Sequence, residues 1–255
     1  MLATTNPIDV VLLTKNSQHM LKKALTSLYQ NVPVKNLIVI DGYSNDDTIP
    51  IILKFKQQYG NVLIFQSNGT RAKAREIGIS KVTTDWFLFL DSDVVLCKNW
   101  FNRIQKHLSE DTGFVWGLNI DVIPNVTDKR IIRLQSALAT QCFHLRGGTH
   151  DALIRTSAAK NLKIPQELHA FEDAYLMKAI KRQGYKITVG EDVYCLHYKP
   201  PTNWDIQNQI LLAVTEVRCC LLYSHMYRYS LFYIIFALYG FLQSLISLSK
   251  KGSPV

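Results

Sequence analysis

The stretch that decides the fold runs from Trp86 to Leu96 and reads W-F-L-F-L-D-S-D-V-V-L. Its first five residues are apolar, which is typical of a buried strand. Asp91 and Asp93 then interrupt the apolar run, one residue apart. In an extended backbone both carboxylates point to the same side, and such oxygen ligands suit Mg²⁺ or Mn²⁺ bridging two phosphates. Two aspartates at this spacing are common in proteins and are weak evidence by themselves. The alternative to a metal site is a turn whose acidic side chains face water.

The sequence on either side alternates between strand and helix patterns. Short β-branched runs are separated by segments with helical periodicity, as in 21–28, where leucines recur at i, i+4 and i+7. This alternation predicts an α/β domain with a Rossmann-like, mostly parallel sheet and flanking helices, which we place at residues 1–205. The predicted strands are 8–13, 37–40, 62–65, 86–90, 114–118 and 186–189.

The composition is that of a globular protein with a basic surface. The 255 residues are 47% hydrophobic and 19% charged, and the net charge is +9. This charge favours an anionic partner such as a phosphate, a nucleic acid or an acidic lipid surface. Five cysteines without a C-x-x-C spacing fit a reduced compartment, and no signal peptide is visible. We therefore expect a cytoplasmic protein.

The last part of the chain differs from the rest. Residues 229–248 are mostly apolar and rich in aromatic side chains. A helix of about 20 such residues can just cross a bilayer core of about 30 Å. The alternative is a buried or dimerisation helix, since serines and a glutamine interrupt the segment. We expect 206–255 to be a hydrophobic helical tail that holds the protein at the membrane, as a span or as an interfacial helix.

Polar residues follow the strands at the edge where a parallel sheet binds its ligands. The crevice of such a sheet lies beyond the carboxyl ends of its strands. There Asp41 can accept hydrogen bonds from a base or a ribose, although an ordinary capped turn is the alternative. The candidate residues for this crevice are Thr14 and Asn16 after the first strand, Asp41 and Ser44 after the second, and Asp91, Ser92 and Asp93 after the fourth.

Two helix starts add charged candidates. Arg71 and Arg75 lie four residues apart in N-G-T-R-A-K-A-R, a spacing that suits a diphosphate near a helix N-terminus. The alternative is a solvated basic face. Glu172 and Asp173 begin the amphipathic segment F-E-D-A-Y-L, where they either stabilise a helix start or provide a general base.

Together these motifs resemble the inverting nucleotide-sugar glycosyltransferases of family two, which have the GT-A fold. The resemblance covers residues 8 to about 190 through T-K-N, I-D-G-Y-S-N-D-D-T, R-A-K-A-R-E-I-G, F-L-D-S-D and F-E-D-A-Y-L. It implies that Asp41 contacts the base or ribose of the donor. It further implies that Asp91 and Asp93 hold the metal and diphosphate, and that Asp173 is the base. Gly147 and Gly148 resemble the family's segment on the acceptor side.

Some positions depart from the family pattern. Ile40 stands where the family often has a second aspartate, and V-V-L after the aspartates supplies no further ligand. His197 is then the candidate third metal ligand, because a late strand carries it towards the sheet; a structural histidine is the alternative. The Q-x-x-R-W signature of processive enzymes is absent, so one sugar per encounter is expected.

The expected reaction is direct displacement with inversion, from a UDP- or GDP-sugar to a hydroxyl. A polyprenyl phosphate is already an anion and needs little help from a base, so the acid pair favours a glycan or lipid-linked saccharide acceptor. A polyprenyl-phosphate glycosyltransferase is the alternative. A nucleic-acid-binding protein is less favoured, because the basic residues are scattered and acidic loops would repel a backbone. A non-catalytic nucleotide-sugar binder also fits the motifs.

Overall fold

The structure is a computed structural model that describes residues 6–122, 148–168, 171–198, 214–215, 217–224 and 234. Its strands are β1 Ile8–Thr14, β2 Val34–Asp41, β3 Val62–Gln66, β4 Trp86–Asp91, β5 Val94–Leu96, β6 Thr112–Val122, β7 Asp151–Arg155 and β8 Lys186–Tyr198. Its helices are α1 Gln18–Asn31, α2 Thr48–Tyr59, α3 Arg71–Lys81, α4 Trp100–Ile104, the 3-10 helix η1 Gln105–His107, α6 Thr156–Ala159 and α7 Glu172–Arg182.

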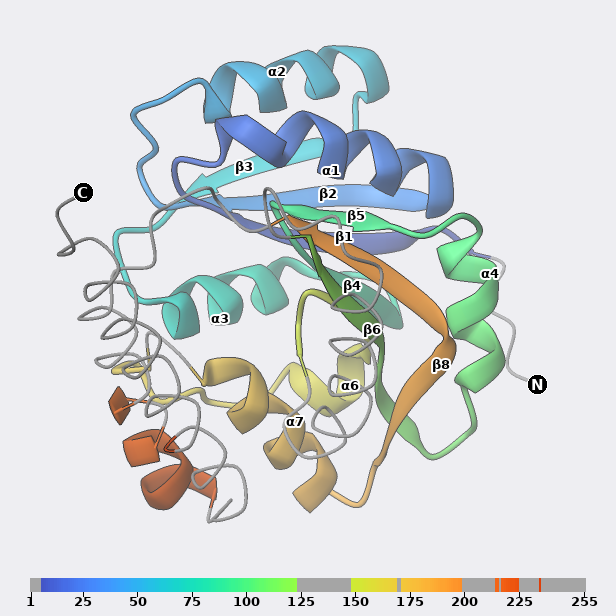
Figure 1. Ribbon diagram of the computed structural model, residues 1–255, viewed down its shortest axis with the longest axis vertical. Helices are drawn as coiled ribbons and strands as arrows, with labels where there is room; N and C mark the ends of the chain where they lie inside the picture. The colour runs from blue at the N-terminus through green and yellow to red at the C-terminus, as the bar shows by residue number, and fades with distance from the viewer. Residues whose placement is uncertain are drawn as a thin grey trace, which may run out of the picture. The chain divides into compact units, whose positions relative to one another are not determined.

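The strands form one sheet in the order β3-β2-β1-β4-β7-β6-β8-β5 (Figure 1). The first four are parallel to one another, as the alternating pattern predicts, and β1 is buried along almost its whole length. The second half of the sheet is mixed, because β7 runs antiparallel to both β4 and β6. The prediction of a mostly parallel sheet therefore holds for the half formed by β3, β2, β1 and β4 and is wrong for the other half.

Helices cover both faces of the sheet. In Figure 1, α1 and α2 lie on one face and α3 on the other, with α6 and α7 on the same side as α3. The predicted apolar stripe of α1 is confirmed, since Leu21, Leu25 and Leu28 are all fully buried. They join a core cluster that also contains Leu12 of β1 and Leu88 of β4. This packing fixes the strand ends that carry the polar loops.

Gly78 lets α3 pack directly on β1. A Cβ at this position would overlap Val11 Cγ1, and Val11 is fully buried with a stiff, branched side chain. We expect Gly78→Ala to destabilise the fold by about 1–3 kcal/mol through overpacking, despite a gain of about 1 kcal/mol in helix propensity. Urea unfolding measures the difference. Ser80→Ala, on the exposed face of α3, is the matched control, and an unchanged midpoint for Gly78→Ala would contradict this packing.

The short strand β5 explains the V-V-L that follows the aspartates. These residues pair antiparallel with β8, which continues to Tyr198 instead of ending at residue 189 as predicted. A register shift beside Gly190 interrupts the β6–β8 ladder, and the exposed residues Glu191 and Asp192 follow it. The strand then resumes and carries His197 back across the sheet edge.

The chain divides into two compact units, Met1–Pro200 and Pro201–Val255. In the second unit the described residues include helical positions at 214–215 and 217–219 and the π-helix η2 Cys220–Ser224. No described helix is both long and apolar enough to cross a bilayer. The predicted hydrophobic segment 229–248 lies outside the described residues except at Ile234. The predicted division at residue 205 and the membrane role of the tail stay predictions.

Candidate functional site

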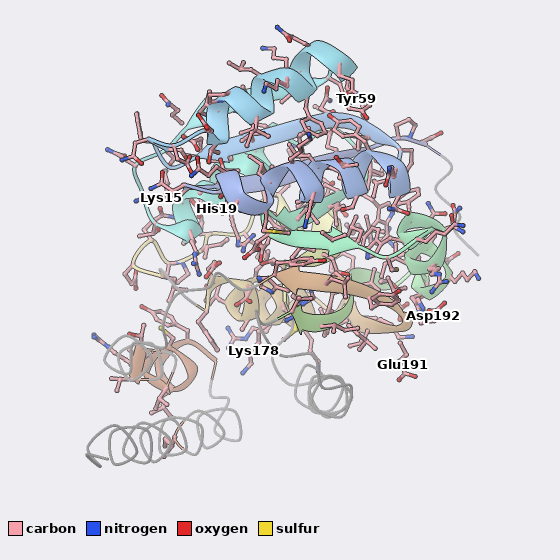
Figure 2. All side chains as sticks on the ribbon, turned by 45° about the horizontal axis from the view of Figure 1, so that its top comes forward. Lys15, His19, Tyr59, Lys178, Glu191 and Asp192 are labelled. Carbon is pink, nitrogen blue, oxygen red and sulfur yellow. The ribbon has the colours of Figure 1, made fainter. Side chains whose placement is uncertain are left out.

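A pocket of about 650 Å³ opens where β1, β2 and β4 end. This is the edge at which the sequence predicts the ligand crevice. Figure 2 shows Lys15, which lines the pocket, at one end of the fold and the exposed acids Glu191 and Asp192 at the other. The predicted residues that the pocket brings together are Thr14, Arg71, Arg75, Asp91, Ser92, Asp93 and His197.

Backbone pairing brings together three possible metal ligands that line the pocket. Val94 of β5 pairs with His197 of β8, and the Tyr198 N–H donates to the Asp93 carbonyl at 3.0 Å. These bonds place His197 Nε2 3.2 Å from Asp93 Oδ1. Ligand atoms of Asp91, Asp93 and His197 all lie within 4.8 Å of one another, and each side chain is partly exposed. Two carboxylates and an imidazole of this kind can hold a divalent cation.

Asp41 organises the loops beside the pocket. Its fully buried carboxylate accepts hydrogen bonds from Thr14 Oγ1 at 2.8 Å and from the Ser44 hydroxyl and N–H at 2.6 and 2.8 Å. Asn16 joins the same network, because its N–H donates to Ser44 Oγ and its side-chain oxygen accepts from the Asn45 N–H. Asp41 therefore ties the β1 loop to the β2 loop, and its contact with a base or ribose stays a prediction.

One wall of the pocket combines the start of α3 with basic side chains. The side chain of Thr70 caps α3 by accepting from the Lys73 N–H at 3.3 Å, and Gly69, Thr70 and Arg71 all line the pocket. The first turn of a helix carries partial positive charge and attracts anions. The exposed Arg71 side chain and Lys15 add full charges at the same place. This wall suits a diphosphate.

Arg75 lies deeper than Arg71 and contacts two acids. Its side chain is 6% exposed, its Nε donates to Glu172 Oε1 at 3.1 Å, and its Nη2 is 3.8 Å from Asp91 Oδ1. The guanidinium also lies over the Phe89 ring, 4.8 Å from its centre. Burial raises the pKa of Glu172, while the charge of Arg75 opposes that rise. A solvated basic face is thus excluded for Arg75, whose described partners are protein acids.

The acidic pair begins α7, but its two members occupy different environments. Glu172 is buried against Arg75, whereas Asp173 is partly exposed and accepts the Ala174 N–H at 2.7 Å. Phe171, just before them, is fully buried with a φ of 69°, a strained conformation for a bulky residue. The helix that carries Asp173 therefore begins at a buried, strained residue.

A second group of possible ligands lies under the site. His150 Nδ1 is 2.6 Å from Asp151 Oδ1 and 3.4 Å from Cys195 Sγ, and all three residues are buried. The Asp151 carboxylate also accepts from Trp100 Nε1 at 2.9 Å and from the Gly117 N–H at 3.2 Å. Hydrogen bonds therefore account for Asp151, and we assign no ion to this group.

Of the two glycines predicted on the acceptor side, the structure describes only Gly148. Gly148 is buried just before β7, while Gly147 lies outside the described residues. Two pocket residues that the predicted set left out are Lys15, within T-K-N, and Ser17, whose hydroxyl accepts from Ser92 Oγ at 2.9 Å. Their position in the loop directly after the first strand was the available signal, because the crevice lies beyond the ends of the strands.

Known proteins share both the sequence pattern and the fold. The family model of glycosyl transferase family 2 matches residues 9–163. A poly(ribitol-phosphate) beta-glucosyltransferase of Bacillus spizizenii is 25% identical over 222 residues, which is 77% of this chain. The chain spans 35% of the length of that relative.

Solved structures agree with this match at the level of the fold. The mannosyltransferase PcManGT from Pyrobaculum calidifontis, in complex with GDP-Man and Mn²⁺, has a TM-score of 0.67 at 16% identity, covering 98% of this chain and 77% of that one. S. aureus TarS 1-349 in complex with UDP-GlcNAc has a TM-score of 0.61 at 19% identity, covering 90% and 72%. Both likenesses support the same α/β architecture.

Proposed function

The chain belongs to glycosyl transferase family 2 and so to the glycosyltransferase enzymes, and we propose that it transfers one sugar from a UDP- or GDP-sugar to a hydroxyl acceptor with inversion. The observation that carries this proposal is the pocket at the ends of β1, β2 and β4, which joins cationic groups to a carboxylate–histidine cluster. The acceptor proposed is a glycan or a lipid-linked saccharide.

The donor diphosphate fits the wall formed by the α3 start. Arg71 and Lys15 neutralise its charge, and the helix start adds N–H dipoles. The nucleoside is then directed towards the loop that Asp41 holds between β1 and β2. Support for a nucleotide-sugar donor also comes from the solved structures of similar fold, which hold GDP-Man and UDP-GlcNAc.

Asp91, Asp93 and His197 are proposed to hold a divalent cation beside that diphosphate. Their mixed oxygen and nitrogen set accepts Mn²⁺ more readily than Mg²⁺, which prefers oxygen ligands alone. When bound, the ion supplies charge neutralisation for the departing nucleoside diphosphate. The protein's part is to hold the three side chains together, with Asp91 at the end of β4, Asp93 in the turn before β5 and His197 on β8.

Asp173 is proposed as the base that accepts the proton of the acceptor hydroxyl. Of the acidic pair it is the partly exposed member, and its rigid mount at a helix start suits proton transfer. Attack from the side of Asp173, opposite the departing diphosphate, inverts the anomeric carbon. Glu172 is buried in its ion pair with Arg75 and is not assigned this role.

The acceptor is expected to be anionic. The net charge of +9 favours a phosphate-bearing glycan, and the Bacillus relative is a poly(ribitol-phosphate) glucosyltransferase. A lipid-linked acceptor agrees with the proposed attachment of the tail to the membrane from the cytoplasmic side. That attachment rests on the sequence of 229–248 alone.

A thermal-shift panel tests the donor and metal parts together. A ligand that binds only the folded state increases the free energy of unfolding, by about 2.7 kcal/mol when its concentration is 100 times its dissociation constant. The melting temperature rises as a result. We expect a UDP- or GDP-sugar to raise it, and Mn²⁺ to enlarge that rise. Arg71→Gln is expected to reduce the shift. No metal-dependent shift with any UDP-, GDP- or dTDP-sugar would contradict the proposal, while salt-dependent DNA binding would favour the nucleic-acid alternative.

A further inference from the structure

The buried guanidinium of Arg75 is shared unequally between two carboxylates. Glu172 holds it at 3.1 Å, and Asp91 lies farther away at 3.8 Å. The side chains of Arg75 and Glu172 are 6% and 4% exposed, so water screens their contact weakly, whereas the Asp91 side chain is 33% exposed. Phe89 packs beneath the guanidinium and limits its movement. The position of this one cation therefore affects both carboxylates.

The Asp91 carboxylate can interact with two cations, a bound metal ion and the guanidinium of Arg75. Its carboxylate lies within 4.8 Å of the other two metal ligands and also within ion-pair distance of Arg75. A carboxylate that pairs closely with a guanidinium is a weaker metal ligand, because the two cations compete for the same oxygens and repel each other. The closer contact with Glu172 keeps Arg75 at a longer distance from Asp91.

We propose that Glu172 and Arg75 are positioning residues that set the metal affinity of Asp91, with Glu172 holding the guanidinium away from that carboxylate. The inference rests on the proposed metal site. It assigns the two members of the acidic pair separate tasks: Asp173 acts on the acceptor, and Glu172 acts through Arg75 on the metal ligand. The start of α7 then contributes to both sides of the reaction.

The test is a double-mutant cycle on Mn²⁺ binding. Binding is measured through the electron paramagnetic resonance signal of free Mn²⁺. Glu172→Gln leaves Asp91 as the closest described acid to Arg75, and we expect the dissociation constant for Mn²⁺ to rise about 10-fold. Adding Arg75→Gln removes the competing cation, and the double variant should return to within about 3-fold of the wild type. Glu172→Asp, which keeps the charge but shortens the reach, should give a rise of about 3-fold and serves if Glu172→Gln does not fold.

The outcomes separate this inference from the metal site itself. A purely structural ion pair would leave the double variant at least as weak as Glu172→Gln, and that result would overturn the inference. Unchanged Mn²⁺ binding in folded Glu172→Gln would overturn it as well. If Asp91→Asn binds Mn²⁺ as the wild type does, or the wild type does not bind it, the proposed metal site fails too. Circular dichroism of each variant confirms that the fold is retained.

Discussion

Asp173→Asn is expected to lower the rate of sugar transfer by about 10²–10⁴-fold, the usual contribution of a general base. The amide is nearly isosteric with the carboxylate but cannot accept a proton. Because Asp173 is not among the residues that line the pocket proposed for the donor, the thermal shift produced by the nucleotide sugar should remain. Steady-state rates with a hydroxyl acceptor, together with that shift, measure the two effects separately.

The control for this variant is Glu191→Gln, which removes an exposed acid at the other end of the fold (Figure 2). Its transfer rate should equal that of the wild type. Wild-type turnover by Asp173→Asn would remove Asp173 from the mechanism. Retained turnover would also favour a polyprenyl-phosphate acceptor, whose oxygen is already ionised.

Asp93→Asn is expected to lower transfer by about 10²–10³-fold, comparable to the loss of one group that stabilises charge in the transition state. The substitution should weaken the proposed Mn²⁺ site and also the contact with His197 at 3.2 Å. A high concentration of Mn²⁺ should restore part of the rate, because one carboxylate and the imidazole remain. Initial rates as a function of Mn²⁺ concentration measure this rescue.

His197→Gln makes the comparison specific to the cluster, since it removes the nitrogen ligand and leaves both aspartates in place. It should also raise the Mn²⁺ concentration needed for half-maximal rate. A rate of Asp93→Asn that equals the wild type at every Mn²⁺ concentration would show that the aspartates are an ordinary solvated turn.

The parallel half of the fold was predictable because its signals are local and repeated. Each of the first four strands contains a short apolar run, and Leu21, Leu25 and Leu28 mark the buried face of α1. The candidate site followed from one rule, since polar residues after parallel strands meet at one edge. Thr14 and Asp91, which this rule selected, line one pocket, and so does Arg71, which the start of a helix indicated.

The mixed half was less predictable because its strands depend on distant partners. β5 has three residues, too few for any periodicity, and becomes a strand only through its pairing with β8. β7 is a five-residue segment that starts with Asp151, a charged residue whose burial depends on Trp100 and Gly117. The ion pair between Arg75 and Glu172 could not be predicted either. The two residues are far apart in the sequence, and only the packing of α7 brings them together.

The β5–β8 pairing has a consequence for when the site exists. β5 is the terminal strand of the sheet, and its partner is the last strand of the described first unit. Contacts between segments so distant in sequence form late, because the loop between them must first be closed. The loops after β1 and β2 are close in sequence and are joined through Asp41, so we expect them to form before His197 reaches Asp93. Edge strands also open more easily than central ones. An ion held by Asp93 and His197 would link the two segments that pair at that edge. Opening of the edge and release of the ion would then occur together.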